Sequence, residues 1–220
     1  MAFKFEISDY IYKYCNSDLP DDEWYEENFF PFIKRKDNDI WNRLVIEHRN
    51  ARTIYKIFEG LQAENELLLA QIKTQIIMYV SIQEEVINYI LFKLYDETNQ
   101  VVFELTHREK LTRISIPETS MEKLKKELNH DNKDIIPCYY KQKKVKKNTI
   151  KYENKVKALV KLELIDNDFA SDLITLYEFR NTVHLEAEMK KGFDYNLKIA
   201  KLAYRRVEGL SINLSKKIPS

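Results

Sequence analysis

The sequence has few glycines and few cysteines, and both shortages exclude classes of site. Three glycines among 220 residues leave no glycine-rich loop of the kind that holds phosphate in Rossmann and Walker proteins. Cys15 and Cys138 are the only cysteines, and they belong to no paired motif, so the pattern predicts neither a disulfide framework nor a zinc site. No His, Cys, Asp or Glu cluster has metal-ligand spacing. We therefore expect no metal and no cofactor.

Long apolar runs are missing as well. No run approaches the ~20 residues that a membrane-spanning helix needs. The N-terminal segment carries acids and aromatics and lacks a small-residue cleavage site, which is unlike a signal peptide. A chain with 44% hydrophobic and 32% charged residues has the composition of a soluble globular protein. We expect a cytoplasmic protein that makes no membrane contact.

The net charge of only +1 conceals a local excess of lysine. Residues 138–161 hold nine lysines and one acid, Glu153. Lysine runs often form no more than a solvated surface, and this interpretation stays open. The alternative is a patch that follows phosphates, on which Tyr139, Tyr140 and Tyr152 stack with unpaired bases. The RNA-binding residues predicted on this patch are Lys143, Lys144, Lys146, Lys147 and Tyr140.

Hydrophobic periodicity predicts an all-α fold. Apolar residues recur at helical spacing over 38–61, and the stretch 63–95 lacks proline and glycine and is apolar enough for the centre of a bundle. A short charged helix should follow Pro117. Residues 101–117 are rich in β-branched side chains, which allows a small β-hairpin insertion. The remaining helices are expected at about 149–164, 170–189 and 195–214.

The sequence predicts one helical domain over residues 1–220, since no internal repeat or second domain is recognisable. Residues 1–37 are acidic and aromatic and contain two prolines, so they cannot form one regular helix. We expect them to cap the core. The core itself should span 38–214, with an insertion at about 99–148.

One stretch, "LITLYEFRNTVHLEAEM" at 173–189, places polar residues on a helix otherwise patterned for burial. Arg180 and His184 are four residues apart, so they face the same way with a difference of only ~40°. An arginine near a packed surface needs a partner. A carboxylate such as Glu84 or Glu85 would satisfy it, with His184 bonded to a backbone carbonyl. A phosphate would satisfy it equally well.

The segment "LYEFRNTVHLE" resembles the signature of HEPN domains, all-helical modules in which a late core helix carries Arg, usually Asn or another polar residue, and then His. The segment "QIIMYVSIQEEVINYILFKLY" is similar to the long family helix in which a small residue and an acid precede an apolar run. Ser81 and Glu84 or Glu85 take those places here. Three residues separate Arg180 from His184, fewer than the usual four to six, as in shortened Arg-Asn-x-x-His versions.

This resemblance covers the order of helices over about 63–214, and it implies a HEPN-like helical bundle that cleaves RNA without a metal. His184 has an intrinsic pKa of about 6.5 and suits proton transfer at the 2′-hydroxyl. Arg180 suits the phosphate, because its guanidinium stays charged and binds in a forked geometry. Asn181 would orient the histidine or the sugar. The predicted catalytic residues are thus Arg180, Asn181 and His184.

Two classes of function follow. Active HEPN proteins commonly bring two motif helices together at a dimer cleft, so the resemblance implies a homodimer of a toxin–antitoxin or phage-defence system. It would either cleave RNA or, as a catalytically silent relative, only bind it. The alternative is a non-catalytic helical module for dimerisation or protein interaction. Such a module would bind a partner such as a cognate antitoxin, and Arg180 and His184 would then be interface groups.

Overall fold

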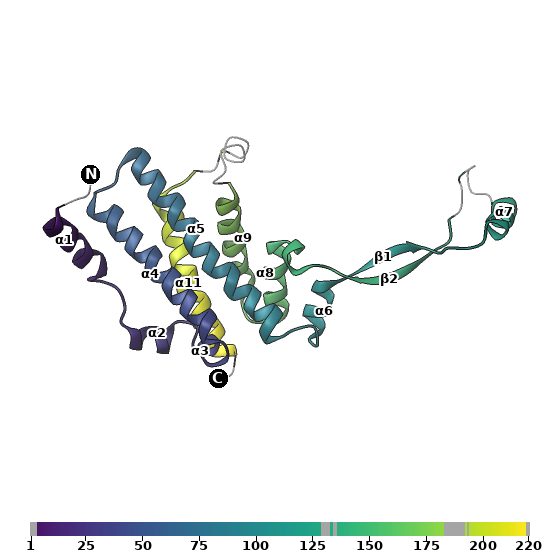
Figure 1. Cartoon of the computed structure of the whole chain (residues 1–220), viewed down its shortest axis with the longest axis horizontal. Helices are drawn as coiled ribbons and strands as arrows, with labels where there is room; N and C mark the ends of the chain where they lie inside the picture. The colour runs from purple at the N-terminus through teal and green to yellow at the C-terminus, as the bar shows by residue number, and fades with distance from the viewer. Residues whose placement is uncertain (1–3, 129–132, 134–135, 183–191, 193, 219–220) are drawn as a thin grey trace.

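The computed structural model describes residues 4–128, 133, 136–182, 192 and 194–218. These residues are mostly helical, with one two-stranded antiparallel sheet, so the prediction of a mainly α-helical protein is confirmed. Figure 1 shows a bundle of helices from which the sheet extends as a long arm. The helices outside the arm are α1 (Phe5–Asn16), α2 (Asp22–Asn28), α3 (Pro31–Lys36), α4 (Asn38–Gly60), α5 (Asn65–Tyr89), α6 (Gln100–Thr106), α8 (Tyr152–Lys161), α9 (Asn167–Asn181) and α11 (Leu197–Lys217).

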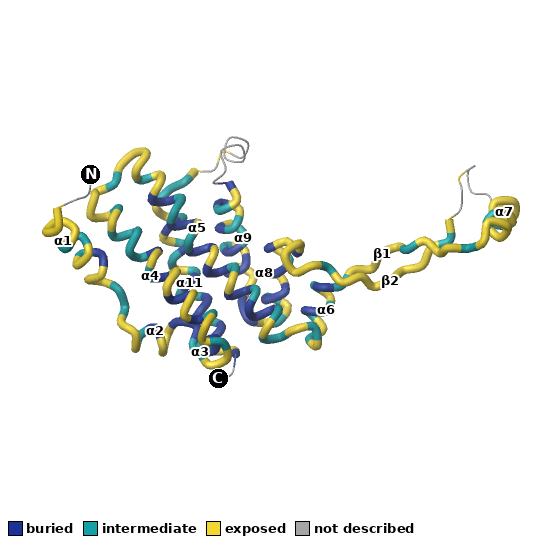
Figure 2. The backbone as a smooth tube through the Cα atoms, viewed as in Figure 1, coloured by how far each residue is buried: buried dark blue, intermediate teal, exposed yellow. Residues whose placement is uncertain are grey.

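Helix α5 lies at the centre of the bundle and contacts α4, α8, α9 and α11. It continues without a break into a π-helical turn, η1 (Ile90–Leu94), which confirms the long helix expected over 63–95. Figure 2 shows that buried residues concentrate on α5 and on the sides of its neighbours that face it. The buried α5 side chains include Ile72, Ile76, Tyr79, Val80, Ile82, Val86 and Ile87. Within the described ranges, no helix is long and apolar enough to span a membrane.

Short-range signals set the ends of several helices. The Asp37 carboxylate accepts a hydrogen bond from the Ile40 N–H at 3.1 Å and caps α4. The Asp166 carboxylate accepts one from the Phe169 N–H at 2.7 Å and caps α9. A side-chain oxygen at this position satisfies one of the free N–H groups of the first helical turn. The segment 1–37 divides into α1, α2 and α3 instead of forming one helix.

The expectation of a β-hairpin within residues 101–117 is wrong, because the two strands that pair are not both in this segment. Residues 100–106 form α6, because the Asn99 side chain caps the Val101 N–H at 2.9 Å and Val102 is fully buried. Strand β1 (His107–Arg113) then pairs with β2 (Cys138–Lys144), and helix α7 (Glu118–Glu127) lies between the two strands in sequence. β-branched residues alone do not choose between helix and strand, since burial and capping decide.

A buried histidine, His48 of α4, joins the N-terminal segment to the core. It is 1% exposed, and its Nδ1 lies 2.8 Å from the Tyr25 hydroxyl. Its ring packs near Phe29 and Tyr204, at centroid distances of 4.9 and 6.1 Å. Burial, together with the nearby positive charge of Arg52, lowers the pKa of His48 to about 4. The imidazole is therefore neutral in the folded protein at neutral pH.

The lowered pKa of His48 predicts that the folded protein becomes less stable in acid. His48 binds a proton at about pH 6.5 when unfolded but only at about pH 4 when folded, so its contribution to stability is complete above pH 6.5 and is lost as the pH falls toward 4. Between pH 6.5 and 5 the loss should be about 2 kcal/mol. We expect His48→Gln to remove this slope when urea unfolding is measured over that range. An equal slope in both proteins would contradict the assignment.

Candidate functional site

The first two residues of the predicted motif, Arg180 and Asn181, lie at the C-terminal end of α9. Arg180 Nη2 is 3.8 Å from Glu84 Oε2 on α5, and Arg180 Nη1 donates to Asn181 Oδ1 at 3.2 Å. The guanidinium also lies 5.5 Å from the centre of the Tyr177 ring. A carboxylate therefore meets Arg180. The arginine and glutamate side chains are 35% and 26% exposed, and ion pairs at such positions are weak, so Glu84 holds the guanidinium only weakly.

His184 lies outside the described residues, as does the C-terminal part of the helix expected over 170–189. The placement of Arg180 relative to His184 therefore stays a prediction. The two-fold dimer that would bring two such histidines together stays a prediction as well.

Tyr152, one of the tyrosines expected to stack on unpaired bases, is a core residue. It is 4% exposed, and its ring is stacked on Tyr177 at 4.0 Å with an interplanar angle of 7°. Its hydroxyl has no hydrogen-bond partner within the described part of the chain, and burial raises its pKa. The expectation for Tyr152 is thus wrong, because helical periodicity turns this residue toward α9.

Two hollows flank Tyr177. One, of about 420 Å³, is lined by residues including Lys151, Glu178 and Asn181. The other, of about 380 Å³, is lined by residues including Glu84, Lys147 and Lys155.

Lys155 is held at the second hollow by its Nζ, which donates to Asn88 Oδ1 at 2.9 Å. Its pKa is lowered because burial disfavours the ammonium. The Arg180 end of α9 therefore borders a surface with both basic and acidic groups.

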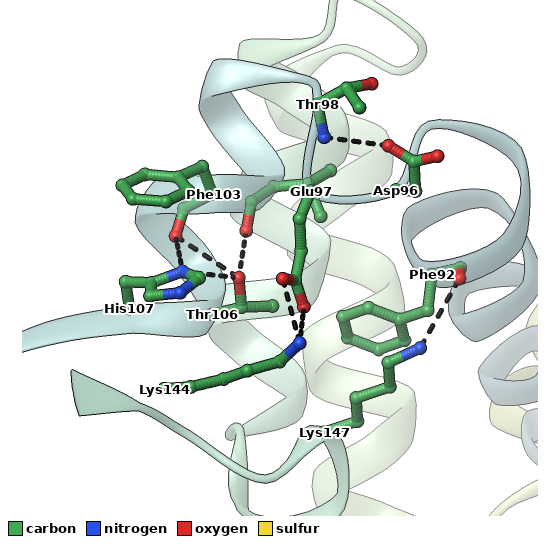
Figure 3. A network of polar contacts seen from close by, with 10 residues as sticks. Phe92, Asp96, Glu97, Thr98, Phe103, Thr106, His107, Lys144 and Lys147 are labelled. Carbon is green, nitrogen blue, oxygen red and sulfur yellow. Dashed lines mark hydrogen bonds and ion pairs between the residues drawn. The ribbon is translucent and has the colours of Figure 1, made fainter. Parts of the chain in front are cut away.

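Two of the predicted RNA-binding lysines hold the base of the arm, as Figure 3 shows. Lys144 Nζ lies 2.6 Å from a carboxylate oxygen of Glu97. Lys147 Nζ donates to the Phe92 carbonyl oxygen at 3.4 Å and lies 5.0 Å from the centre of that ring. These contacts tie the strand β2 and the segment after it to η1 and to the segment that follows η1. Lys144 and Lys147 thus have partners within the protein.

The start of strand β1 is anchored in the same region. The His107 ring stacks on Phe103 at 4.1 Å, and His107 Nδ1 lies 3.1 Å from both the Phe103 carbonyl oxygen and the hydroxyl of the buried Thr106 (Figure 3). The Val145 N–H donates to the Thr106 carbonyl oxygen at 2.7 Å. The arm is therefore joined to the bundle by side-chain as well as backbone contacts.

The register of the arm separates the predicted RNA-binding residues onto two faces. Successive side chains of a strand point to opposite faces. Lys143 therefore points to one face, while Tyr140 and Lys144 point to the other. Lys146 lies beyond the end of β2 and is exposed.

Strand pairing brings Lys143 together with three cations that the sequence analysis did not single out. Arg108 pairs with Lys143 and Lys110 pairs with Lys141, all on the same face. We call these four residues the cationic face. Both strands, "HREKLTR" and "CYYKQKK", carry cations at alternate positions. These cations form one charged face only because the two strands pair.

The cationic face has no neutralising group among the described residues. All four side chains are exposed, and none makes an ion pair or side-chain hydrogen bond with any described residue. Like charges directly opposite each other destabilise an antiparallel pair. A trough of about 440 Å³ follows the ribbon here, lined by both strands. The arm thus presents an uncompensated row of positive charge along one face.

Among the described residues, no group of three or more His, Cys, Asp or Glu side chains is placed to hold a metal ion. Comparison with models of protein families, with curated proteins and with solved structures finds no match to this chain.

Proposed function

We propose that the protein binds RNA, and that the cationic face of the arm is the main contact surface. The two directly opposed like-charge pairs, Arg108 with Lys143 and Lys110 with Lys141, carry this proposal. An isolated two-stranded ribbon is marginally stable in water, and like-charge pairs weaken it further. A polyanion that lies along the ribbon removes this repulsion and releases its own counterions.

The spacing of the cations suits a nucleic-acid backbone. Neighbours on one face of a strand are separated by about 7 Å, and the two strands by about 4.8 Å. The four charges therefore form a compact patch that one strand of phosphates follows. Tyr139 lies on the same face and is 46% exposed, which suits stacking on an unpaired base. RNA is favoured over DNA because the Arg-Asn-x-x-His motif suits chemistry at a 2′-hydroxyl.

The test is the salt dependence of RNA binding. Each lost phosphate contact reduces the slope of log K against log salt by about 0.7 for a single strand. Replacing Lys110 and Lys143 together with glutamine should make the slope shallower by about 1.4 and weaken binding at 0.1 M salt. A matched double variant at Lys13 and Lys157, which form ion pairs on the bundle, should bind as the wild type does. Fluorescence anisotropy with labelled RNA and with DNA of the same sequence measures both.

Equal slopes of log K against log salt for the two double variants would show that the arm is not the RNA contact surface. Absence of RNA binding by the wild type would instead favour the helical interaction module.

Reversing one charge should separate stability from binding. In Lys110→Glu the new carboxylate faces Lys141, so an ion pair replaces a repulsive pair and should stabilise the ribbon by about 0.5 kcal/mol. Amide hydrogen exchange of β1 and β2 should slow down, while RNA affinity should fall. Gln142→Glu places a negative charge on the opposite face, directly across from Glu109, so it should speed exchange but should affect RNA binding much less. In Lys110→Glu, faster exchange of β1 and β2 together with unchanged RNA binding would contradict both expectations.

The second candidate function is metal-independent cleavage of bound RNA at the end of α9. It is favoured by the partly exposed Arg180, whose only carboxylate partner among the described residues is Glu84 at 3.8 Å. Arg180 would bind the scissile phosphate, Asn181 would orient the sugar or the histidine, and His184 would transfer the proton. The hollow next to Asn181 also contains Lys151, which adds a positive charge on the side from which the arm emerges.

A further inference from the structure

A cleft distinct from the arm and from the end of α9 lies between α4, α5 and α11. It is lined by residues of all three helices and of the turn that joins α4 to α5, and it encloses about 470 Å³. Cavities of about 300–1,000 Å³ are the usual size of small-molecule sites. We call it the α4–α5–α11 cleft.

The charge of the cleft is positive. Lys201 and Arg205 lie one turn apart on α11, and both are exposed at the cleft. Neither makes an ion pair or a side-chain hydrogen bond with another described residue. The acid of the lining, Glu59, is already bound by Lys56 at 2.8 Å.

Arg52 adds a third cation, 5.3 Å from the centre of the Tyr204 ring. An anionic group is therefore favoured in this cleft over a neutral or cationic one.

Aromatic rings form the walls. Tyr79 is 2% exposed, and its ring lies 5.5 Å from that of Tyr204. The Tyr55 hydroxyl donates to Glu59 at 2.9 Å, and the Tyr204 hydroxyl donates to Glu208. With these hydroxyl groups engaged elsewhere, the rings offer apolar surface to the cleft. Flat aromatic groups gain most from such walls, because stacked and edge-to-face ring pairs attract each other beyond the effect of area burial.

A largely buried glutamine whose amide has no partner among the described residues lies in the same lining. Gln71 is 5% exposed, and its side chain makes no hydrogen bond to any described residue. Its neighbour one turn later, Gln75, by contrast donates to the Ala51 carbonyl oxygen at 2.9 Å. The Gln71 amide atoms are not among the fully buried polar atoms that lack a partner, so they reach the space of the cleft, where water or a ligand can bond to them. Gln71 is thus poised to hydrogen-bond a polar group within the cleft.

We propose that the α4–α5–α11 cleft binds a small planar aromatic anion. The ring lies against Tyr55 and Tyr204, and the anionic group is held by Lys201 and Arg205. A polar substituent of the ring meets the Gln71 amide. Aromatic carboxylates and aromatic phosphates share this chemistry, so competing ligands are needed to show which of the two groups the cleft prefers.

The probe is 8-anilinonaphthalene-1-sulfonate, an aromatic anion whose fluorescence rises on binding, with uncharged N-phenyl-1-naphthylamine as its matched analogue. Added to the full chain, the anion should bind at one site and at least about tenfold more tightly than the analogue. The double change Lys201→Gln and Arg205→Gln should weaken the anion about tenfold or more and leave the analogue unchanged. Lys198→Gln with Lys216→Gln, an equal charge loss on α11 outside the cleft lining, should change neither.

Displacement of the probe distinguishes the ligand sources. Indole-3-acetate represents carboxylates and adenosine 5′-monophosphate represents phosphates, with indole and adenosine as their uncharged counterparts. Displacement by either anion but not by its counterpart supports the proposal and identifies the preferred group. Equal binding of the charged and uncharged probes, several equivalent sites, or no effect of the Lys201 and Arg205 changes would overturn it.

Discussion

A chain in which residues 107–144 are replaced by an Asn-Gly turn is expected to lose RNA affinity about a hundredfold or more while its helical bundle stays folded. The affinity should fall because all four residues of the cationic face are removed. The bundle should persist because none of the described residues of this segment belongs to the buried core. The Val145 N–H already donates to the Thr106 carbonyl oxygen, so a two-residue turn joins the cut ends with little strain.

Circular dichroism and urea unfolding should give the same helical signal and nearly the same free energy of unfolding for the shortened and full chains. Anisotropy titrations should then show the loss of RNA binding. The charge-preserving control replaces the four cations of the face with one another, as in Arg108→Lys and Lys143→Arg, and should retain most of the affinity. A shortened chain that binds RNA as tightly as the full chain would place the contact surface on the bundle.

Replacing His184 with alanine is expected to lower the rate of RNA cleavage about a hundredfold or more, the usual effect of losing a general acid–base group. Arg180→Ala should be similarly damaging, because it removes charge stabilisation of the phosphate that is often worth about 3 kcal/mol. Activity should survive EDTA and leave 2′,3′-cyclic phosphate ends. The control is Asp168→Asn, which removes an exposed charge at the opposite end of α9 and should leave the rate nearly unchanged.

Single-turnover cleavage of end-labelled RNA by the purified variants separates this step from binding. Loss of the cationic face should weaken binding and leave cleavage of bound RNA nearly intact, whereas His184→Ala should do the reverse. Cleavage that stops on addition of a chelator, or a His184→Ala protein as active as the wild type, would show that other groups act on the RNA. If the protein binds RNA without cleaving it, the proposal that the arm contacts RNA would stand and the proposal of catalysis would be contradicted.

The local features of this fold were predictable from sequence because short-range physics decides them. The stretch 63–95 lacks proline and glycine, and such a segment forms a helix wherever its apolar surface is buried. Asp37 and Asp166 cap the helices that follow them through bonds to N–H groups three residues away. The partner of Arg180 could also be predicted from the sequence. A buried or half-buried arginine requires an anion, and Glu84 lies on the long apolar helix α5.

Tertiary structure alone decided the surfaces on which the proposals rest. The cationic face exists because β1 pairs with β2 across an intervening helix, and the alternation within each strand does not specify that distant register. A shift of the pairing by one residue would place Lys143 on the same face as Glu109 instead of Arg108 and Lys110. The α4–α5–α11 cleft likewise joins Gln71 to Arg205, which are far apart in sequence. Sequence periodicity determines which side chains of a helix turn inward, but only packing decides which of them leave a space between helices.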